Sequence, residues 1–302
     1  MFDDFTCDTK FANFPFKVKS SAMKLLRTKN GIPISYAYEL LRYINYKPEG
    51  HARHWISIMQ PLEVWLPQID EQMKVGEFLA KITEKIDKQK SLIELLKKYK
   101  RGVISKLLSR SLAFSNDTSI DWISHKVGDF CSVQMCKRIF KEQTSTAGDV
   151  PFYKIGTIGG EPDAYISREV YEEYRRKYNF PQKGEFLISC AGTVGKCVVY
   201  NGEDSYYQDS NIVWLRNESN FVLNEYLYIL VSNVDWSTLN STTITRIYND
   251  NLRNLVFDFP SIEVQKKISE FYNALDKRIE EEDSKLSKLL TLKQGFIQGL
   301  FA

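Results

Sequence analysis

The stretch from Gly192 to Cys197 contains residue types that could do chemistry. A glycine-lysine pair at Gly195 and Lys196 is typical of loops that hold a phosphate group. The full phosphate-loop pattern also needs a glycine where Cys190 stands and a serine or threonine where Cys197 stands. Both ends fail, and the chain has no G-x-G-x-x-G loop for a dinucleotide. The sequence therefore predicts no nucleotide cofactor on this chain.

Cysteines and histidines are the remaining candidates for a metal or nucleophilic centre. Four of the cysteines form two pairs, Cys131/Cys136 and Cys190/Cys197. Four residues separate the first pair and six the second, so the second pair exceeds the two to four residues usual between paired zinc ligands. His51 and His54 stand three apart, without the His-Glu-x-x-His arrangement of a metalloprotease. We therefore expect no metal site and no catalytic residue, and interpret the chain as one that recognises or organises something.

Cysteine usage and hydropathy also bear on where the chain works. An odd number of cysteines in a chain with no signal peptide fits the reducing cytoplasm. No run of about 18 apolar residues occurs, so the sequence predicts no contact with a membrane.

Residues 67–108 occur twice, because they match residues 260–301 at an offset of 193 positions without a gap. A repeat of such length shows that a whole structural unit occurs twice, which says more about the fold than the helix or strand propensity of single residues. The identical pairs are Pro67/Pro260, Ile69/Ile262, Gln72/Gln265, Lys74/Lys267, Glu77/Glu270, Phe78/Phe271, Ile86/Ile279, Ser91/Ser284, Leu96/Leu289, Lys100/Lys293, Gly102/Gly295, Ile104/Ile297 and Leu107/Leu300.

Both copies have the spacing of a long helix with a heptad seam, in which apolar residues alternate steps of four and three. The first seam is Val75, Leu79, Ile82, Ile86, Ile93, Leu96, Val103 and Leu107; the second is Ile268, Tyr272, Leu275, Ile279, Leu286, Leu289, Phe296 and Leu300. Each is interrupted at the same two places, by Gln89 and Lys100 or by Glu282 and Lys293. These shared interruptions favour an antiparallel pair over separate packing of each helix on its own neighbour, with Gln89 near Glu282.

The rest of the chain predicts an α+β fold: a mixed α/β domain beside an antiparallel coiled coil of two long helices. We expect a complete domain at 119–259, a polar linker at 111–118, and helices in segments 62–110 and 260–302. In the complete domain the predicted elements are strands at 151–158, 212–215 and 254–259, a hairpin at 184–200, and helices at 167–178 and 223–233. Ser167 is the expected helix cap.

Residues 1–61 match only the back of the 119–259 domain. Arg53 and Trp55 align with Arg246 and Tyr248 at the same offset, and residues 21–27 match residues 210–216. A short helix is expected at 35–46. No counterpart of the 184–200 hairpin is expected, so the apolar residues of this segment should lack half of their core.

In its plan and motifs, the chain resembles the specificity (S) subunit of Type I restriction-modification systems over almost its whole length. Residues 66–72 and 259–265 resemble that family's Leu-Pro-x-x-x-x-Gln entrance to each conserved helix, and residues 100–107 and 293–300 resemble its helix exits. Residues 184–189 followed by 192–196 resemble a loop typical of the family's target-recognition domains.

The resemblance implies a DNA-reading subunit that catalyses nothing itself. Each target-recognition domain would read one half of a split site in double-stranded DNA. The helices would dock two methyltransferase (M) subunits, with restriction (R) subunits joining through them; S-adenosylmethionine, ATP and Mg would be bound by these partners. Because residues 1–61 are incomplete, a second S chain or an upstream S fragment is a further expected partner. A silent specificity cassette and a coiled-coil scaffold without DNA readout are the alternatives.

The DNA-binding residues expected within 119–259 lie on its loops. Glycines let the backbone approach DNA closely, whereas amide, hydroxyl and cationic side chains contact base edges or phosphates. The candidates are Lys154, Ser189, Gly192, Thr193, Gly195, Lys196, Gln208, Asn211 and Arg246. The domain holds 14 Lys and Arg against 18 Asp and Glu, a net charge of −4. Since DNA binders usually carry a basic footprint, we expect weak affinity for DNA without partners.

Overall fold

The computed structural model describes residues 1–113, 121–239 and 246–301. Residues 114–118 of the predicted linker, the first two residues of the predicted 119–259 domain, and Ala302 lie outside the described residues. The chain divides into two compact units: unit 1 is Met1–Lys98 with Lys277–Ala302, and unit 2 is Tyr99–Asp276. No helix in the described ranges is long and apolar enough to cross a membrane.

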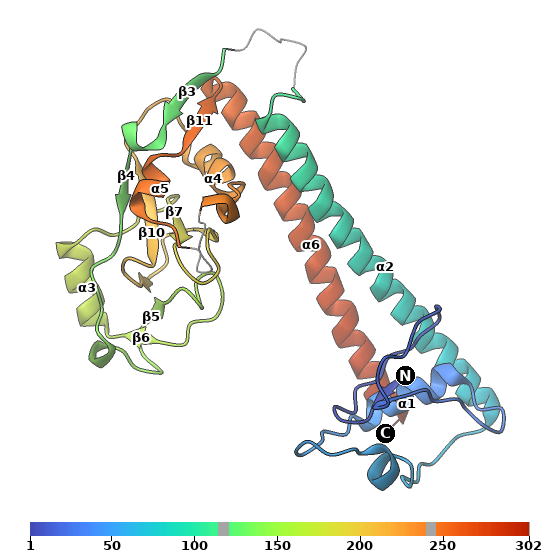
Figure 1. Ribbon diagram of the computed structural model, residues 1–302. Coiled ribbons are helices and arrows are strands. Elements are labelled where there is room, and N and C mark those ends of the chain that lie inside the picture. Colours follow the sequence, from blue (N-terminus) through green and yellow to red (C-terminus); the bar gives the residue numbers. More distant parts are fainter. Residues whose placement is uncertain (114–120, 240–245, 302) are drawn as a thin grey trace. The chain divides into compact units, whose positions relative to one another are not determined.

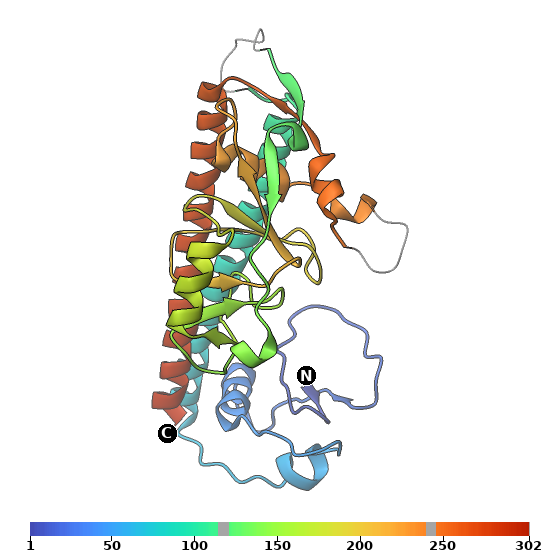
Figure 2. The ribbon, with the colours of Figure 1, turned by 90° about the vertical axis from the view of Figure 1, so that its left-hand side faces the viewer.

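Two 40-residue helices, α2 (Ile69–Leu108) and α6 (Ile262–Phe301), form the repeated part of the chain (Figures 1 and 2). Each begins two residues after a proline, at a place where a proline removes no intrahelical hydrogen bond. In unit 1 they pack antiparallel, with seam residues such as Leu79, Ile86 and Ile279 buried. The predicted meeting of Gln89 with Glu282 is confirmed: Gln89 Nε2 donates to the main-chain oxygen of Glu282 at 3.0 Å and to its Oε2 at 2.6 Å.

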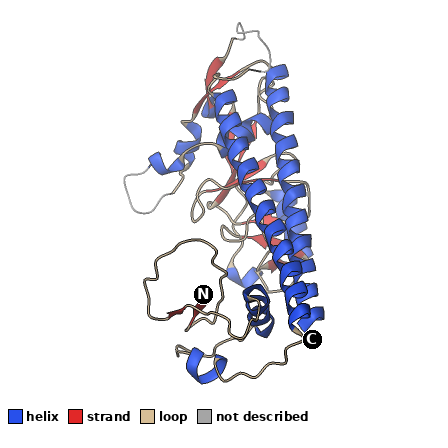
Figure 3. Cartoon of the chain, turned by 90° about the vertical axis from the view of Figure 1, so that its right-hand side faces the viewer, coloured by secondary structure: helices blue, strands red, loops and turns tan. Residues whose placement is uncertain are grey.

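The remaining elements of unit 1 are short (Figure 3). They are β1 (Phe2–Asp3), β2 (Met23–Lys24), α1 (Ile34–Ile44) and a π-helical turn at Trp55–Met59. β1 and β2 pair antiparallel. The apolar side of α1 faces inward at Tyr36, whose ring lies 5.1 Å from that of Phe301.

Unit 2 is built on a four-stranded antiparallel sheet of order β4-β10-β7-β8. These strands are β4 (Cys131–Gln134), β10 (Ile212–Asn217), β7 (Phe186–Ser189) and β8 (Cys197–Val199). A three-stranded sheet has β5 (Val150–Tyr153) between β6 (Tyr165–Ile166) and β9 (Tyr206–Tyr207), and β3 (Ile123–Lys126) pairs with β11 (Val256–Phe259). The helices are α3 (Arg168–Lys177), α4 (Asn224–Ser232) and α5 (Asn249–Arg253).

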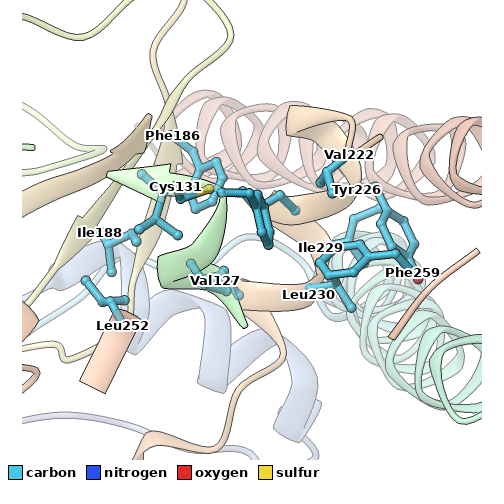
Figure 4. Close-up of a cluster of buried hydrophobic side chains, with 14 of the residues drawn as sticks. Val127, Cys131, Phe186, Ile188, Val222, Tyr226, Ile229, Leu230, Leu252 and Phe259 are labelled. Atoms are coloured by element: carbon cyan, nitrogen blue, oxygen red, sulfur yellow. The ribbon is translucent and has the colours of Figure 1, made fainter. Parts of the chain in front are cut away.

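The central strands β7 and β10 are buried on both faces of the four-stranded sheet, and their successive residues point to opposite sides. On β7, Phe186 and Ile188 belong to a core completed by α4 and by the unit 2 turns of α2 and α6 (Figure 4). Leu187 faces a second core, shared with Trp214 of β10 and with Tyr171 of α3. The capping role predicted for Ser167 is confirmed, since its hydroxyl accepts a hydrogen bond from the backbone N–H of Val170 at 3.4 Å.

Three details of the sequence prediction are wrong. The strand predicted at 151–158 ends at Tyr153, because a turn follows in which Lys154 N–H donates to Thr157 Oγ1 at 3.0 Å. Leu300, predicted to lie in the seam, is exposed. A counterpart of the 184–200 hairpin does exist near the N-terminus: Phe2 bridges to Thr9, and Asp3 N–H donates to the Asp8 oxygen at 2.9 Å.

The N-terminal hairpin escaped notice because its loop lacks the glycines of the other copy. Cys7 takes the left-handed conformation, with a φ of 58°, where the second hairpin uses Gly195. The Asp3 carboxylate holds this loop by accepting hydrogen bonds from the backbone N–H groups of Phe5 (3.0 Å) and Thr6 (2.9 Å). A short polar side chain thus stabilises a turn that is usually marked by glycine.

Candidate nucleic-acid interface

The predicted DNA-binding residues lie on four segments of unit 2: residues 153–158, 189–196, 208–211 and 246–248, here called the loop cluster. Three of these segments follow strands. Residues 153–158 continue from the carboxyl end of β5 and residues 189–196 from that of β7, while residues 208–211 connect the end of β9 to the start of β10. Because β5 and β9 are parallel, and β7 and β10 antiparallel, these strand ends are neighbours. The topology therefore gathers residues that are far apart in sequence.

Hydrogen bonds join the four segments. Gln208 N–H donates to the Tyr153 oxygen at 2.8 Å, and Gln208 Oε1 accepts from Ile155 N–H at 3.3 Å. Cys190 N–H donates to the Asn211 oxygen at 2.7 Å, and Cys190 oxygen accepts from Ile247 N–H at 2.9 Å. The segments therefore form one connected surface.

Two glycines shape the tip of the 189–196 loop. Gly192 and Gly195 have φ values of 68° and 78°, in the left-handed region that glycine adopts without strain. A Cβ at Gly195 would overlap the ring of Trp236, so this position also has no room for a side chain. Thr193 is exposed between them. The sequence prediction that these glycines form a loop is consistent with this geometry.

Ser189 and Lys196 hold the base of the same loop. Ser189 is buried; its hydroxyl donates to the main-chain oxygen of Thr193 and accepts from Lys196 N–H at 3.1 Å. The ammonium of Lys196 donates to the main-chain oxygen of Ile158 at 2.6 Å, so it ties this loop to the 153–158 turn. Both residues belong to the cluster, but their side chains position the loop.

The other two cations of the cluster have polar partners that leave them partly exposed. Lys154 Nζ lies 2.9 Å from a carboxylate oxygen of Asp163, and its side chain is about two-fifths exposed. Arg246 Nη2 donates to the Ser210 oxygen at 3.5 Å, and its guanidinium lies 5.8 Å from the ring centre of Tyr248. These contacts fix where both positive charges are presented.

Arg138 and Tyr248 belong to the same surface and were missed in the sequence. Arg138 Nε donates to Asp209 Oδ2 at 2.8 Å, next to Gln208, and its side chain is largely exposed. Tyr248 is an exposed aromatic residue beside Arg246. The adjacent basic residues Lys137 and Arg138 could have indicated a DNA contact. No local sequence pattern, however, connects Arg138 with Asp209, which lies 71 positions further along the chain.

The paired cysteines are free thiols, of which Cys131, Cys136 and Cys190 are buried. Burial raises the pKa of the Cys136 and Cys197 thiols to about 12 and that of Cys190 to about 11, so all three stay protonated near neutral pH. Among the described residues, no three His, Cys, Asp or Glu side chains come together as a set that could hold a metal ion.

Known proteins match this chain in sequence. The family model for the Type I restriction modification DNA specificity domain matches residues 119–291. A Haemophilus influenzae protein assigned as a type I restriction enzyme specificity subunit is 50% identical over 143 residues, covering 47% of this chain and 37% of that protein. The specificity subunit of the EcoR124I/EcoR124II type I restriction enzyme of Escherichia coli is 33% identical over 92 residues, covering 29% and 23%. The matches thus span little more than a third of the first relative and less than a quarter of the second.

The fold also matches a solved structure. The crystal structure of the Type-I restriction-modification system S subunit from M. genitalium superposes with a TM-score of 0.59 at 16% identity, covering 89% of this chain and 72% of that chain. The α+β fold with its pair of long helices is therefore confirmed, as is the resemblance drawn from the sequence motifs. Since the family model covers more than half of the 302 residues, the chain belongs to the family of Type I restriction modification DNA specificity domains.

Proposed function

We propose that this chain is a non-catalytic subunit of a Type I restriction-modification complex, and that its loop cluster reads one half of a split DNA site. The observation that carries the proposal is the convergence of all nine predicted residues. They come from four separate segments of unit 2 that hydrogen bonds join, and all of them except the buried Ser189 reach its surface. A surface of exposed or half-buried amide, hydroxyl and cationic groups at the ends of a sheet suits the reading of base edges.

The residues of the loop cluster divide between reading and positioning. Asn211 and Gln208 have the amide groups that read adenine, and Arg246 suits guanine or a phosphate. Lys154 and Thr193 are placed to contact the DNA backbone. Ser189, Gly192, Gly195 and Lys196 hold the loop in the shape that brings Thr193 forward.

The charge of the domain supports an assembly in which partners supply part of the DNA affinity. Residues 119–259 carry a net charge of −4, whereas residues 62–110 hold 11 Lys and Arg against 7 Asp and Glu. We infer that the α2 and α6 helices dock two M subunits, which enclose the duplex and bring S-adenosylmethionine. R subunits join through M and bring the ATP- and Mg-dependent steps. This chain holds none of these cofactors.

The same proposal assigns the parts of the chain. Residues 1–61 are the back of a first target-recognition domain, and residues 119–259 are a complete one. Segments 62–110 and 260–302 are the conserved helices, and 111–118 is a linker. The internal match of 67–108 with 260–301 supports this division.

A gel-shift selection from randomised duplex DNA tests the function, with the chain assembled on purified M subunits. We expect one block of bases to be enriched, and Arg246→Ala to weaken binding to it by about 10- to 100-fold, since a bidentate base contact is worth ~1–3 kcal/mol. Arg176→Ala, which removes an exposed cation of α3 away from the cluster, is the matched control. A folded complex that selects no sequence would support the silent cassette, and failure to bind M would support a scaffold.

A further inference from the structure

The turn at residues 208–211 has an unusual backbone between the two amide residues Gln208 and Asn211. Ser210 takes a φ of 50°, in the left-handed region that residues with a Cβ rarely adopt. Asn211 N–H donates to the main-chain oxygen of Asp209, so the turn closes over three residues. A three-residue turn around a residue with positive φ is the rare, strained form of the γ-turn. The strained residue therefore stands next to the proposed base readers.

The equivalent turn of unit 1 lacks this strain. Ser21 occupies the position of Ser210 in the internal sequence match and in the strand pairing. Its φ is not positive, and Met23 N–H donates to the Ser20 oxygen at 3.2 Å across an ordinary four-residue turn. The pairing of the two strands therefore does not by itself impose a left-handed backbone at this position.

An arginine contacts each of these serines, but in a different way. In unit 1, Arg53 Nη2 donates to the hydroxyl of Ser21 at 3.1 Å. In unit 2, the corresponding Arg246 donates from Nη2 to the main-chain oxygen of Ser210 at 3.5 Å. The cation of Arg246 thus stabilises the backbone of the strained turn itself.

The residue before Ser210 is held by a second arginine. Arg138 Nε donates to Asp209 Oδ2 at 2.8 Å. The Asp209 side chain is 18% exposed, whereas that of Arg138 is 59% exposed. An ion pair with one such exposed partner adds little to global stability. Its effect is local, since it fixes the side chain of a turn residue.

Main-chain hydrogen bonds fix both ends of the turn. Gln208 N–H donates to the Tyr153 oxygen at 2.8 Å, and the Asn211 oxygen accepts from Cys190 N–H at 2.7 Å. A residue in a sparsely populated conformation persists only where its surroundings over-determine it, and such residues gather at functional sites. The contacts at both ends and in the middle of the turn supply that constraint for Ser210.

We propose that Ser210 and Arg138 are positioning residues, which hold the amide groups of Gln208 and Asn211 in their reading geometry before DNA binds. Ser210 does so through its left-handed backbone, and Arg138 does so through Asp209. Readers that are fixed in advance lose less conformational freedom on binding and are less able to turn toward a wrong base. The inference rests on the proposed function, because it takes Gln208 and Asn211 as base readers.

Ser210→Gly tests the role of the strained backbone, with the chain assembled on M subunits. Glycine adopts a φ of 50° without strain but also adopts many other conformations. We expect a melting temperature no lower than that of the natural chain, while discrimination against single-base changes in the selected site falls about tenfold. Ser210→Asn should keep the discrimination, since asparagine tolerates the left-handed region. Ser21→Gly, at the unstrained equivalent position, is the matched control and should leave discrimination unchanged.

Arg138→Gln tests the second positioning role and separates it from direct contact with phosphate. A positioning residue should lower discrimination about tenfold and leave the salt dependence of binding unchanged. Loss of a phosphate contact would instead weaken binding to all duplexes equally and lower the salt slope by about one unit. Asp209→Asn should lower discrimination as much as Arg138→Gln, and the double variant should lose no more than either alone.

Selection with the natural complex, run in parallel, distinguishes the two proposals. If the natural complex selects bases and both Ser210→Gly and Arg138→Gln select them as sharply, the positioning roles are overturned and the proposed function stands. A uniform loss of affinity for every duplex in both variants would also overturn the positioning roles. If the natural complex selects no bases, the proposed function fails and the positioning roles fail with it.

Discussion

The two halves of the helical repeat place a lysine at the same seam position but neutralise it differently. In unit 2, the ammonium of Lys100 contacts the Asp276 carboxylate and lies 3.5 Å from the ring centre of Tyr272. In unit 1, the ammonium of Lys293 lies 2.6 Å from Thr83 Oγ1 and 2.6 Å from Glu39 Oε1. Thr83 is the counterpart of Asp276 at the offset of 193. The negative charge has therefore moved from the facing long helix to α1.

This difference shows what holds α1 in place. The Lys293 side chain is 4% exposed and that of Glu39 is 3% exposed, whereas the Lys100 side chain is 15% exposed. A buried charge that loses its partner is far more destabilising than one with access to water. Unit 1 thus depends on a contact between α1 and the helix pair that unit 2 does not need.

Glu39→Gln should cause the largest effect, because it leaves the buried ammonium of Lys293 without a countercharge. We expect the free energy of unfolding to fall by about 3–5 kcal/mol, measured by urea denaturation followed by circular dichroism. Glu94→Gln, at an exposed position of α2 in the same unit, is the control and should change little.

A second substitution should rescue the Glu39→Gln variant. Adding Thr83→Asp to Glu39→Gln recreates in unit 1 the arrangement seen at Lys100 and Asp276, so we expect most of the lost stability to return. A double variant no more stable than Glu39→Gln alone would show that the two lysine sites are not equivalent.

The repeated glutamines at the start of the two long helices give the next largest difference in expected stability. Gln265 accepts from Leu223 N–H at 3.0 Å and donates to the Phe221 and Pro260 oxygens at 2.8 and 2.9 Å. Gln72 donates only to the Pro67 oxygen, at 2.8 Å, and its buried Oε1 has no partner. Pro33, which precedes α1 as Leu223 precedes α4, has no N–H group to donate.

Gln265→Ala should therefore lower the free energy of unfolding by about 1–3 kcal/mol, since it leaves the α4 N-cap without its acceptor. Gln72→Ala should lower it by about 1 kcal/mol or less. Parallel urea denaturation curves of the two variants measure the difference. Equal losses would mean that the extra bonds of Gln265 contribute nothing.

Asp276→Asn is expected to have a smaller effect than Glu39→Gln. The Tyr272 ring and partial access to water still stabilise the Lys100 ammonium, so we expect a loss of about 1 kcal/mol. Thermal unfolding at low and high salt measures this loss, which should shrink as salt screens the pair. A loss as large as that of Glu39→Gln would contradict the comparison of the two lysines.

Glu282 at the middle of the seam predicts a small pH dependence. Hydrogen bonds from Gln89 and Lys285 hold the pKa of its carboxyl below the usual 4.5. The resulting stabilisation is present above about pH 4.5 and is lost as the pH falls through the lower folded-state pKa. Glu282→Gln removes this stabilisation. Between neutral pH and about pH 4, the melting temperature of the variant should therefore fall less than that of the natural chain. An identical acid response in both proteins would rule out this contribution.

The sequence predicted those parts of the molecule that depend on local spacing. Heptad steps placed both long helices, the shared interruptions placed Gln89 beside Glu282, and Ser167 marked the start of α3. Gly192 and Gly195 marked the loop of the candidate site, because a left-handed backbone favours glycine.

Features that depend on contacts between distant residues could not be predicted in this way. Arg138 pairs with Asp209 across 71 positions, and Lys293 pairs with Glu39 across 254. No period or motif connects such residues before the chain folds. The N-terminal hairpin was missed for a different reason: Asp3 and Cys7 form its turn where the other copy uses glycine.

Mapping DNA methylation in cells that carry this chain and the M subunits proposed as its partners tests most directly whether residues 119–259 read DNA through the loop cluster. We predict methylation within a motif that contains a fixed block of bases. Asn211→Ala, Gln208→Ala or Arg246→Ala should relax or abolish part of that block, and Arg176→Ala should leave it intact. Methylation without a sequence motif, or a motif unchanged by all three substitutions, would contradict the account.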